Sequence, residues 1–218
     1  MLQSPLGIPA SKWRQDEEIG IFSDSVGQFF EKECAPHVQD WRKAGVVPKD
    51  MWKKAGEMGI LCASVSEEYG GMGGDFRHEA IIAEQMGWKG IDGFGITLHN
   101  AIIAPYLETY GTKEQKEKYL PKMATGEIIT AIAMTEPGAG SDLQGMKTTA
   151  KKDGNGYVIN GSKTFISNGQ NANMILVCAK TDPTLGAKGI SIMLVETEGT
   201  EGFERGRNLE KIGQKAAD

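Results

Sequence analysis

The chain has 218 residues, of which 39% are hydrophobic, so it is long enough to bury the core of one large or two small globular domains. Its formal net charge of −5 argues against a nucleic-acid-binding role. No apolar run is long enough to span a bilayer, and residues 1–10 lack the basic flank and the apolar stretch of a signal peptide.

The cysteines and histidines do not have the pattern of a disulfide framework or a metal site. The three cysteines, Cys34, Cys62 and Cys178, are widely spaced and include no CxxC motif. The three histidines do not cluster at metal-ligand spacing. This usage favours a reducing compartment, and we predict neither a disulfide nor a bound metal.

The first predicted elements are helices. Apolar residues repeat at helical spacing from Ile19 to Phe30, and Pro36 lies near the end of that segment. Pro48 suits the first position of a second helix, which is predicted to stop near Gly59.

Further helix starts are predicted from capping residues. Asp75 is a suitable N-cap for the next helix, and a mostly apolar helix is predicted over residues 94–110. Thr112 and Gln115 have the spacing of a capping box in front of a helix over residues 116–123.

After Glu127 the pattern changes to short apolar runs separated by turns, which predicts strands. The fold class is therefore α+β, with an amino-terminal all-helical domain over residues 1–126 and an antiparallel β-barrel or β-sandwich domain over residues 127–218. The predicted strands are residues 128–134, 147–152, 157–160, 164–167, 174–179, 190–196 and 203–207.

The first strand runs into a loop that suits a ligand. Gly138 and Gly140 permit positive φ angles and let a ligand approach the backbone closely. Successive N–H groups in such a bend form a concave anion site, and Thr135 and Ser141 add hydroxyl groups beside it.

A second stretch with glycine at both ends, residues 160–169, has a similar composition. If residues 164–167 form a strand, Phe165 and Ser167 share one face, where a ring can stack on a flat heterocycle and a hydroxyl can hydrogen-bond to it. Taken singly, each stretch also reads as an ordinary hairpin turn, and their spacing does not show that they meet.

Two nucleotide-binding motifs are ruled out at these stretches. Leu143 stands where the third glycine of a dinucleotide-binding fingerprint belongs, and no apolar helix follows it. Residues 156–164 lack the spacing of a P-loop and are flanked by predicted strands on both sides.

Two stretches follow the helical half of the chain: Thr-Glu-Pro-Gly-Ala-Gly-Ser-Asp at residues 135–142 and Asn-Gly-Ser-Lys-Thr-Phe-Ile-Ser-Asn-Gly at residues 160–169. In this combination the chain closely resembles the acyl-CoA dehydrogenase family. The resemblance is nearest to the long-chain type and covers almost the whole chain. Members of this family are FAD-dependent enzymes of fatty acid β-oxidation that convert an acyl-CoA to the trans-2-enoyl-CoA. A glutamate removes the α proton, the β hydrogen leaves as hydride to the flavin, and an electron-transfer flavoprotein takes the electrons.

The resemblance implies an FAD site made from both glycine-bearing stretches. Its residues are Ile132, Ala133, Met134, Thr135, Glu136, Gly138, Gly140, Ser141, Phe165, Ile166 and Ser167. Many members have Trp and Thr where this chain has Phe165 and Ser167, so we expect altered flavin spectra rather than lost binding.

For the acyl-CoA substrate, the resemblance implies Ser141 next to the flavin and Lys180 near the CoA phosphates, although Lys180 also reads as a solvated lysine at a strand end. Gly95, Leu98 and Ile102 correspond to an acyl channel, and the competing interpretation is that they are plain helix core.

The family carries its catalytic glutamate in a third, helical domain, which we expect to be missing from these 218 residues together with the last strands of the β-domain. No residue of this chain is assigned as catalytic, and neither Glu84 nor Glu136 is predicted to be the catalytic base. The sequence therefore predicts the amino-terminal portion of an FAD-dependent acyl-CoA dehydrogenase, inactive alone. We expect it to retain FAD weakly and to associate.

For the full-length form the resemblance implies a homotetramer or homodimer, located in the bacterial cytoplasm or the mitochondrial matrix. Two alternatives stay open from the sequence: a flavin-dependent acyl-CoA oxidase, and a naturally short, non-catalytic binding module.

Overall fold

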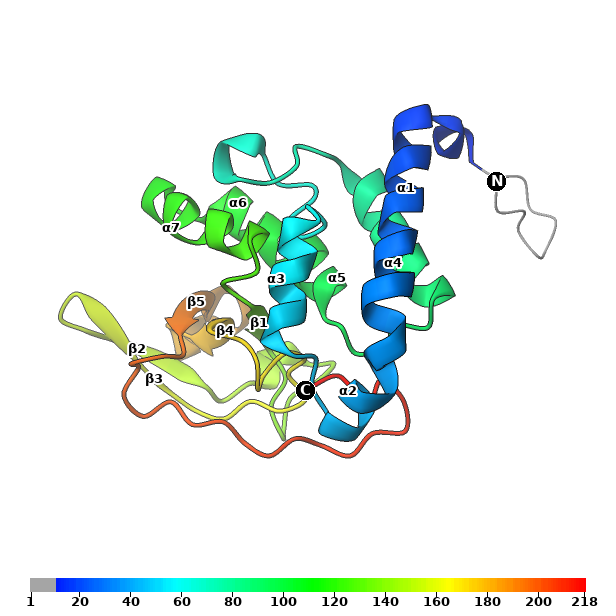
Figure 1. Cartoon of the computed structure of the whole chain (residues 1–218). Helices are drawn as coiled ribbons and strands as arrows, with labels where there is room; N and C mark the ends of the chain where they lie inside the picture. The colour runs from blue at the N-terminus through cyan, green and yellow to red at the C-terminus, as the bar shows by residue number, and fades with distance from the viewer. Residues whose placement is uncertain (1–10) are drawn as a thin grey trace.

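Helices form the first half of the chain in the computed structural model, which describes residues 11–218 (Figure 1). Short 3-10 and π-helical turns join them. The bounds of the helices are α1 (Glu17–Phe29), α2 (Val38–Ala44), α3 (Lys49–Glu57), α4 (Phe76–Trp88), α5 (Ile96–Leu98), α6 (Ala104–Tyr110) and α7 (Lys113–Ala124).

Side-chain caps fix where several of these helices begin. Both predicted caps are confirmed, because Asp75 forms a capping box with His78 at α4 and Thr112 forms one with Gln115 at α7. Pro48 differs from the prediction by one position. Its ψ of 147° is extended, so it precedes α3 as the N-cap instead of forming its first residue.

The helix predicted over residues 94–110 is three elements. A π-helical turn over His99–Ile103 separates α5 from α6. Pro105 follows at the start of α6 and has no N–H to donate to the carbonyl one turn earlier, so the hydrogen-bond ladder cannot continue regularly through this point.

The second half of the chain contributes a five-stranded sheet. The strands are β1 (Thr130–Ala133), β2 (Thr149–Asp153), β3 (Gly156–Asn160), β4 (Met174–Lys180) and β5 (Ile190–Glu196). The central strand is β4, which pairs with β5 in antiparallel fashion along one edge and with β1 in parallel fashion along the other. The α+β class is confirmed, while the sheet itself is mixed rather than antiparallel throughout.

The β2–β3 hairpin extends beyond the central strand and projects from the sheet (Figure 1). It meets β4 only where Thr149 pairs with Lys180. Two predicted strands were wrong: residues 164–167 form a loop in which Phe165 has a φ of 58°, and residues 203–207 run as irregular chain. Neither segment carries a ladder of backbone hydrogen bonds.

One apolar cluster belongs to both halves of the chain. It includes Ile103, Leu107 and Leu120 from the helices and Met174 and Leu176 from β4. A larger cluster around Trp52 and Phe30 fills the helical half. Burial of this shared cluster stabilises the sheet against the helices.

The helix-to-strand transition depends on one glycine. Gly126 has a φ of 74°, which glycine adopts without strain, and a Cβ at this position would clash with the backbone of Trp52. The last residues, 197–218, form no helix or strand and run back along the molecule toward α2 (Figure 1). There the Asn208 amide donates to the Gly45 carbonyl.

Candidate functional site

The two glycine-bearing stretches meet where β1 ends. The Thr164 N–H donates to the Thr135 carbonyl oxygen at 2.9 Å, and the Lys163 ammonium donates to the Met134 carbonyl oxygen at the same distance of 2.9 Å. The parallel pairing of β1 with β4 brings these stretches together, and this pairing is not visible in the sequence.

A buried carboxylate fastens the two stretches to each other. The Glu136 carboxylate accepts from the Lys163 ammonium at 2.9 Å and from the backbone N–H groups of Lys147 and Thr148 at 2.6 and 3.0 Å. Burial alone would raise the pKa of Glu136, but hydrogen bonds from Thr148, Lys147 and Lys163 lower it to about 2. The carboxylate is therefore ionised and engaged by the protein itself.

Phe165 combines an exposed ring with an unusual backbone. Its residue is 74% exposed, and its φ of 58° is a left-handed conformation that costs a bulky residue roughly 1–2 kcal/mol. Phe76 and Tyr110 are similarly exposed at 76% and 79%, but neither has a positive φ. The strained backbone, more than the exposure, distinguishes Phe165 from ordinary surface aromatics.

The neighbours of Phe165 point in different directions. Ile166 is partly buried against a small cluster of Ala131, Ala133, Ala172 and Ile175 under the loop. Ser167 is exposed like Phe165. The two were predicted to share one face of a strand, and that reason is wrong because this segment is a loop.

The second end of this loop is held by Asn168. Its side chain is 2% exposed and donates from Nδ2 to the Thr130 carbonyl oxygen at 3.0 Å. Gly95, at the start of α5, lies directly against it, and a Cβ on Gly95 would clash with the Asn168 amide. Gly95, predicted to line an acyl channel, thus contacts the loop of the other stretch.

The first stretch bends tightly and leaves open space around its glycines. Glu136 and Ala139 exchange two backbone hydrogen bonds of 2.8 and 3.1 Å across the bend. Gly138 and Gly140 are exposed, neither has the positive φ that the sequence allowed, and a Cβ on either would meet no atom within 4 Å. Neither φ nor packing demands glycine here, and the backbone at both positions is accessible.

These features fit a planar group that carries phosphates. An exposed aromatic ring, the exposed hydroxyls of Ser141 and Ser167 and the accessible backbone at Gly138 and Gly140 lie on two joined loops. Thr135 and Met134 are partly buried where the loops touch. The donor set contains hydroxyls and backbone N–H groups, as expected for a flavin nucleotide.

Residues predicted for the acyl-CoA side occupy several places. Leu98 is partly buried against the apolar cluster that joins the two halves, whereas Ile102 is 41% exposed. Ile132, predicted for the FAD site, is partly buried against the same cluster. Lys180 ends β4, and its backbone N–H donates to the carbonyl oxygen of Thr148 at 2.9 Å. Lys180 is therefore connected to the Glu136 carboxylate through Thr148, whose N–H donates to that carboxylate.

His99 is a buried polar residue that the sequence did not single out. Its Nδ1 lies 2.8 Å from the Thr130 hydroxyl, and its Nε2 lies 3.2 Å from the Met123 carbonyl oxygen. Burial lowers the pKa of His99 to about 4, so the imidazole is neutral. The contact of His99 with Thr130 could not be predicted from the sequence, because it depends on β1 lying beside the π-helical turn.

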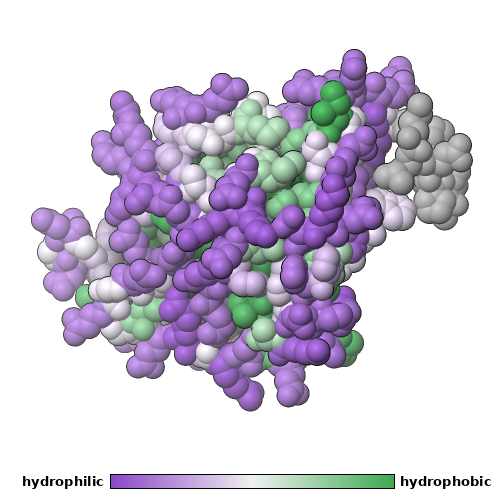
Figure 2. Space-filling view, in the orientation of Figure 1, coloured by the Kyte–Doolittle hydropathy of each residue, from purple (hydrophilic) through white to green (hydrophobic). Residues whose placement is uncertain are grey.

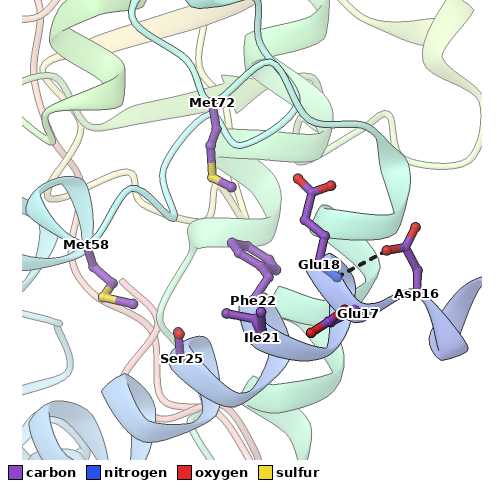
Figure 3. A pocket seen from close by; sticks show the side chains of 8 residues that line it. All are labelled: Asp16, Glu17, Glu18, Ile21, Phe22, Ser25, Met58 and Met72. Atoms are coloured by element: carbon purple, nitrogen blue, oxygen red, sulfur yellow. Dashed lines mark hydrogen bonds between the residues drawn. The ribbon is translucent and has the colours of Figure 1, made fainter.

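An open groove of ≈ 690 Å³ lies elsewhere on the molecule, on the helical half (Figure 3). Ile21, Phe22, Met58 and Met72 give it an apolar floor, with acidic residues of the first turn of α1 at its rim. No residue of the two loops lines it, so it is separate from the candidate site.

Residues 11–218 contain neither a grouping of metal ligands nor a membrane-spanning helix. In this part of the chain no three His, Cys, Asp or Glu side chains are grouped as a metal site would require. Over the same residues, no helix has both the length and the apolar character needed to cross a membrane.

Comparisons with known proteins match both halves of the chain. Residues 16–127 match the family model "Acyl-CoA dehydrogenase, N-terminal domain", and residues 131–218 match "Acyl-CoA dehydrogenase, middle domain". The mitochondrial long-chain specific acyl-CoA dehydrogenase of Mus musculus is 47% identical over 203 residues, which cover 92% of this chain and 47% of that protein.

Solved structures agree with these matches. A crystal structure of an acyl-CoA dehydrogenase from Geobacillus kaustophilus superposes with a TM-score of 0.90 at 52% identity, covering 93% of this chain and 54% of that one. A glutaryl-CoA dehydrogenase from Mycobacterium smegmatis in complex with FADH2 has a TM-score of 0.84 at 29% identity and covers 93% of this chain and 51% of that one. The chain spans about half the length of the relatives it matches.

Proposed function

Because the chain belongs to the acyl-CoA dehydrogenase family, we propose that it forms the FAD-binding part of an enzyme that oxidises acyl-CoA thioesters to trans-2-enoyl-CoA in fatty acid β-oxidation. In this proposal a soluble electron-transfer flavoprotein accepts the electrons. The whole enzyme is a homo-oligomer of the bacterial cytoplasm or the mitochondrial matrix.

One observation carries the proposal: the loops from residues 135–141 and 163–168 are hydrogen-bonded to each other and present the exposed ring of Phe165 beside exposed glycine backbone. When bound, FAD supplies the hydride acceptor. Phe165 stacks on its flat ring, Ser167 and Thr135 donate hydrogen bonds to it, and the backbone at Gly138 and Gly140 faces the phosphates.

On the acyl-CoA side, Gly95, Leu98 and Ile102 line the path of the acyl chain. Leu98 is partly buried beside the apolar cluster that joins the two halves, and Ile102 is 41% exposed. Ser141 sits between the cofactor and the thioester, and Lys180 pairs with a CoA phosphate. No ion pair of the described residues engages the Lys180 ammonium, which leaves it available for that role.

The catalytic base belongs to a part of the whole enzyme outside this chain. Glu136 accepts three hydrogen bonds and has a pKa of about 2, which makes it a poor proton acceptor at neutral pH. Glu84 is paired with Arg14 at 2.6 Å on the helical half. The role of this chain is to bind and orient, and to keep water away from the reacting carbons.

A titration of the purified 218-residue chain with FAD tests the proposal. We expect saturable binding, and we expect Phe165→Ala to weaken it about two- to tenfold, since an aromatic stacking contact contributes about 0.5–1.5 kcal/mol. Tyr157→Ala is the matched control, because Tyr157 is a 50% exposed aromatic residue on β3. Equal losses in the two variants, or no binding by the unmodified chain, would contradict the proposed site.

A further inference from the structure

We propose that Lys163 and Asn168 are positioning residues that hold the loop between them, with Phe165 and Ser167, in its ligand-binding shape before a ligand arrives. This inference rests on the proposed function. It concerns two residues that contact no ligand in the proposal and act through the loop that they fasten.

The first fastening is at the start of the loop. The Lys163 ammonium donates at 2.9 Å both to the Met134 carbonyl oxygen and to the Glu136 carboxylate, and the side chains of this ion pair are only 10% and 6% exposed. One side chain therefore ties the loop to two points of the other glycine-bearing stretch. The Thr164 N–H, next in the chain, adds a backbone hydrogen bond to Thr135.

The second fastening is at the end of the loop. The buried Asn168 amide donates to Thr130 on β1 and is packed against Gly95 at the start of α5. Thr130 is itself held from the other side, because its hydroxyl lies 2.8 Å from His99. This end of the loop is thus connected through β1 to the core of the helical half.

The loop needs both fastenings because its own conformation is unfavourable. Phe165 and Asn168 have φ angles of 58° and 63°, and two such residues occur among its six positions. Non-glycine residues keep this conformation only where the surroundings hold them there. The exposed Phe165 ring makes no buried contact that could do so. Lys163 and Asn168 fasten the loop on either side of this ring, in addition to the packing of Ile166 beneath it.

Amide hydrogen exchange on the ligand-free 218-residue chain tests this directly. The reporters are the N–H groups of Thr164 and Gly169, which are hydrogen-bonded to Thr135 and Ile166. In Asn168→Gly we expect their exchange to be about tenfold faster, the change that follows loss of one ordinary hydrogen bond. In Lys163→Met we expect a larger acceleration, because this variant loses two hydrogen bonds, one of them to the Glu136 carboxylate. Glycine at position 168 keeps the left-handed backbone accessible, so this variant removes only the side-chain contact.

The controls are Lys152→Met on β2 and Asn155→Gly in the hairpin turn, both at exposed positions. We expect neither to change the exchange of the reporters. In all variants the amides of the β4–β5 ladder should keep their rates within about twofold, because these strands do not depend on the loop.

A second arm measures FAD affinity in the same variants. The apparent affinity is set by the fraction of chains whose loop is in its binding shape, so we expect an affinity loss that is no larger than the acceleration of exchange in the same variant. Added FAD should restore the protection of Thr164 and Gly169 in the variants.

Unchanged reporter exchange in Lys163→Met and Asn168→Gly would overturn the inference. So would equal acceleration across the β4–β5 ladder, since the side chains would then support the whole sheet rather than position one loop. If the unmodified chain fails to bind FAD, the proposed function fails, while exchange in the ligand-free chain still decides whether these two residues hold the loop.

Discussion

Glu136 is the residue at which the two glycine-bearing stretches are joined, and its side chain faces the protein rather than open space. The sequence predicts that Glu136 belongs to the FAD-binding loop. In the structure its carboxylate accepts hydrogen bonds from Lys163, Lys147 and Thr148. The residue types on this loop were predictable from the motif. Which of them turns inward was not, because that depends on a lysine 27 positions away in the chain.

The stability of the chain should depend on the ionisation of Glu136. Its pKa is about 2 in the folded chain and 4.5 ordinarily, so the folded state favours the carboxylate. As the pH falls below 4.5 the unfolded chain takes up the proton first, and the stabilisation is lost progressively until about pH 2. The full loss is about 3 kcal/mol.

This loss is measured by acid unfolding, with tryptophan fluorescence as the signal. Glu136→Gln should be less stable at neutral pH and should have a flatter pH dependence over the same range. Glu204→Gln, at an exposed position, should behave like the unmodified chain. If Glu136→Gln and the unmodified chain lose stability in parallel between pH 4.5 and 2, the ionised pair is not the cause.

Among the elements, helix starts were the most predictable and strand pairing the least. The N-cap at Asp75 and the capping box at Thr112 are local, so a few adjacent residues suffice to predict them, although the reciprocal bond from His78 to Asp75 was not predicted. Residues 164–167 have the alternation of a strand, yet the left-handed Phe165 breaks it. The parallel β1–β4 pairing joins segments about forty residues apart and has no local signature.

The contact between α5 and the loop at Asn168 gives a prediction at the level of these elements. Gly95→Ala places a methyl group against the Asn168 amide, which cannot move without losing its hydrogen bond to Thr130. We expect a loss of about 1–3 kcal/mol in the free energy of unfolding, measured with urea.

The matched control is Gly20→Ala in α1, where a Cβ would meet nothing within 4 Å. Removing glycine from a helix interior should stabilise the chain by about 0.5–1 kcal/mol. If both substitutions stabilise, α5 and the loop are not in close contact.

At the scale of the whole molecule, the two halves share buried apolar clusters, since Ile129 and Ala216 also pack with the helices around Trp52. Hydrophilic residues cover most of the face seen in Figure 2. The division into domains at residues 1–126 and 127–218 remains a proposal, because Ile103 and Leu107 of the helices pack in the same cluster as Met174 and Leu176 of the sheet. We expect the two parts to unfold together.

The purified 218-residue chain should not dehydrogenate an acyl-CoA with an artificial electron acceptor, even when FAD is bound. The reason is that the Glu136 carboxylate in the predicted FAD loop is ionised, buried and weakly basic. The measurement is reduction of the acceptor in the presence of acyl-CoA. Turnover that survives Glu136→Gln would mean that another residue of this chain acts as the base.

The β2–β3 hairpin offers a practical opening for engineering. Only one residue pair, Thr149 with Lys180, ties it to the central strand, and its residues 151–158 are exposed. Chain inserted at its tip, between Gly154 and Asn155, would displace no core side chain. A fluorescent label or an affinity tag can therefore be introduced there to follow flavin capture while leaving both loops as they are.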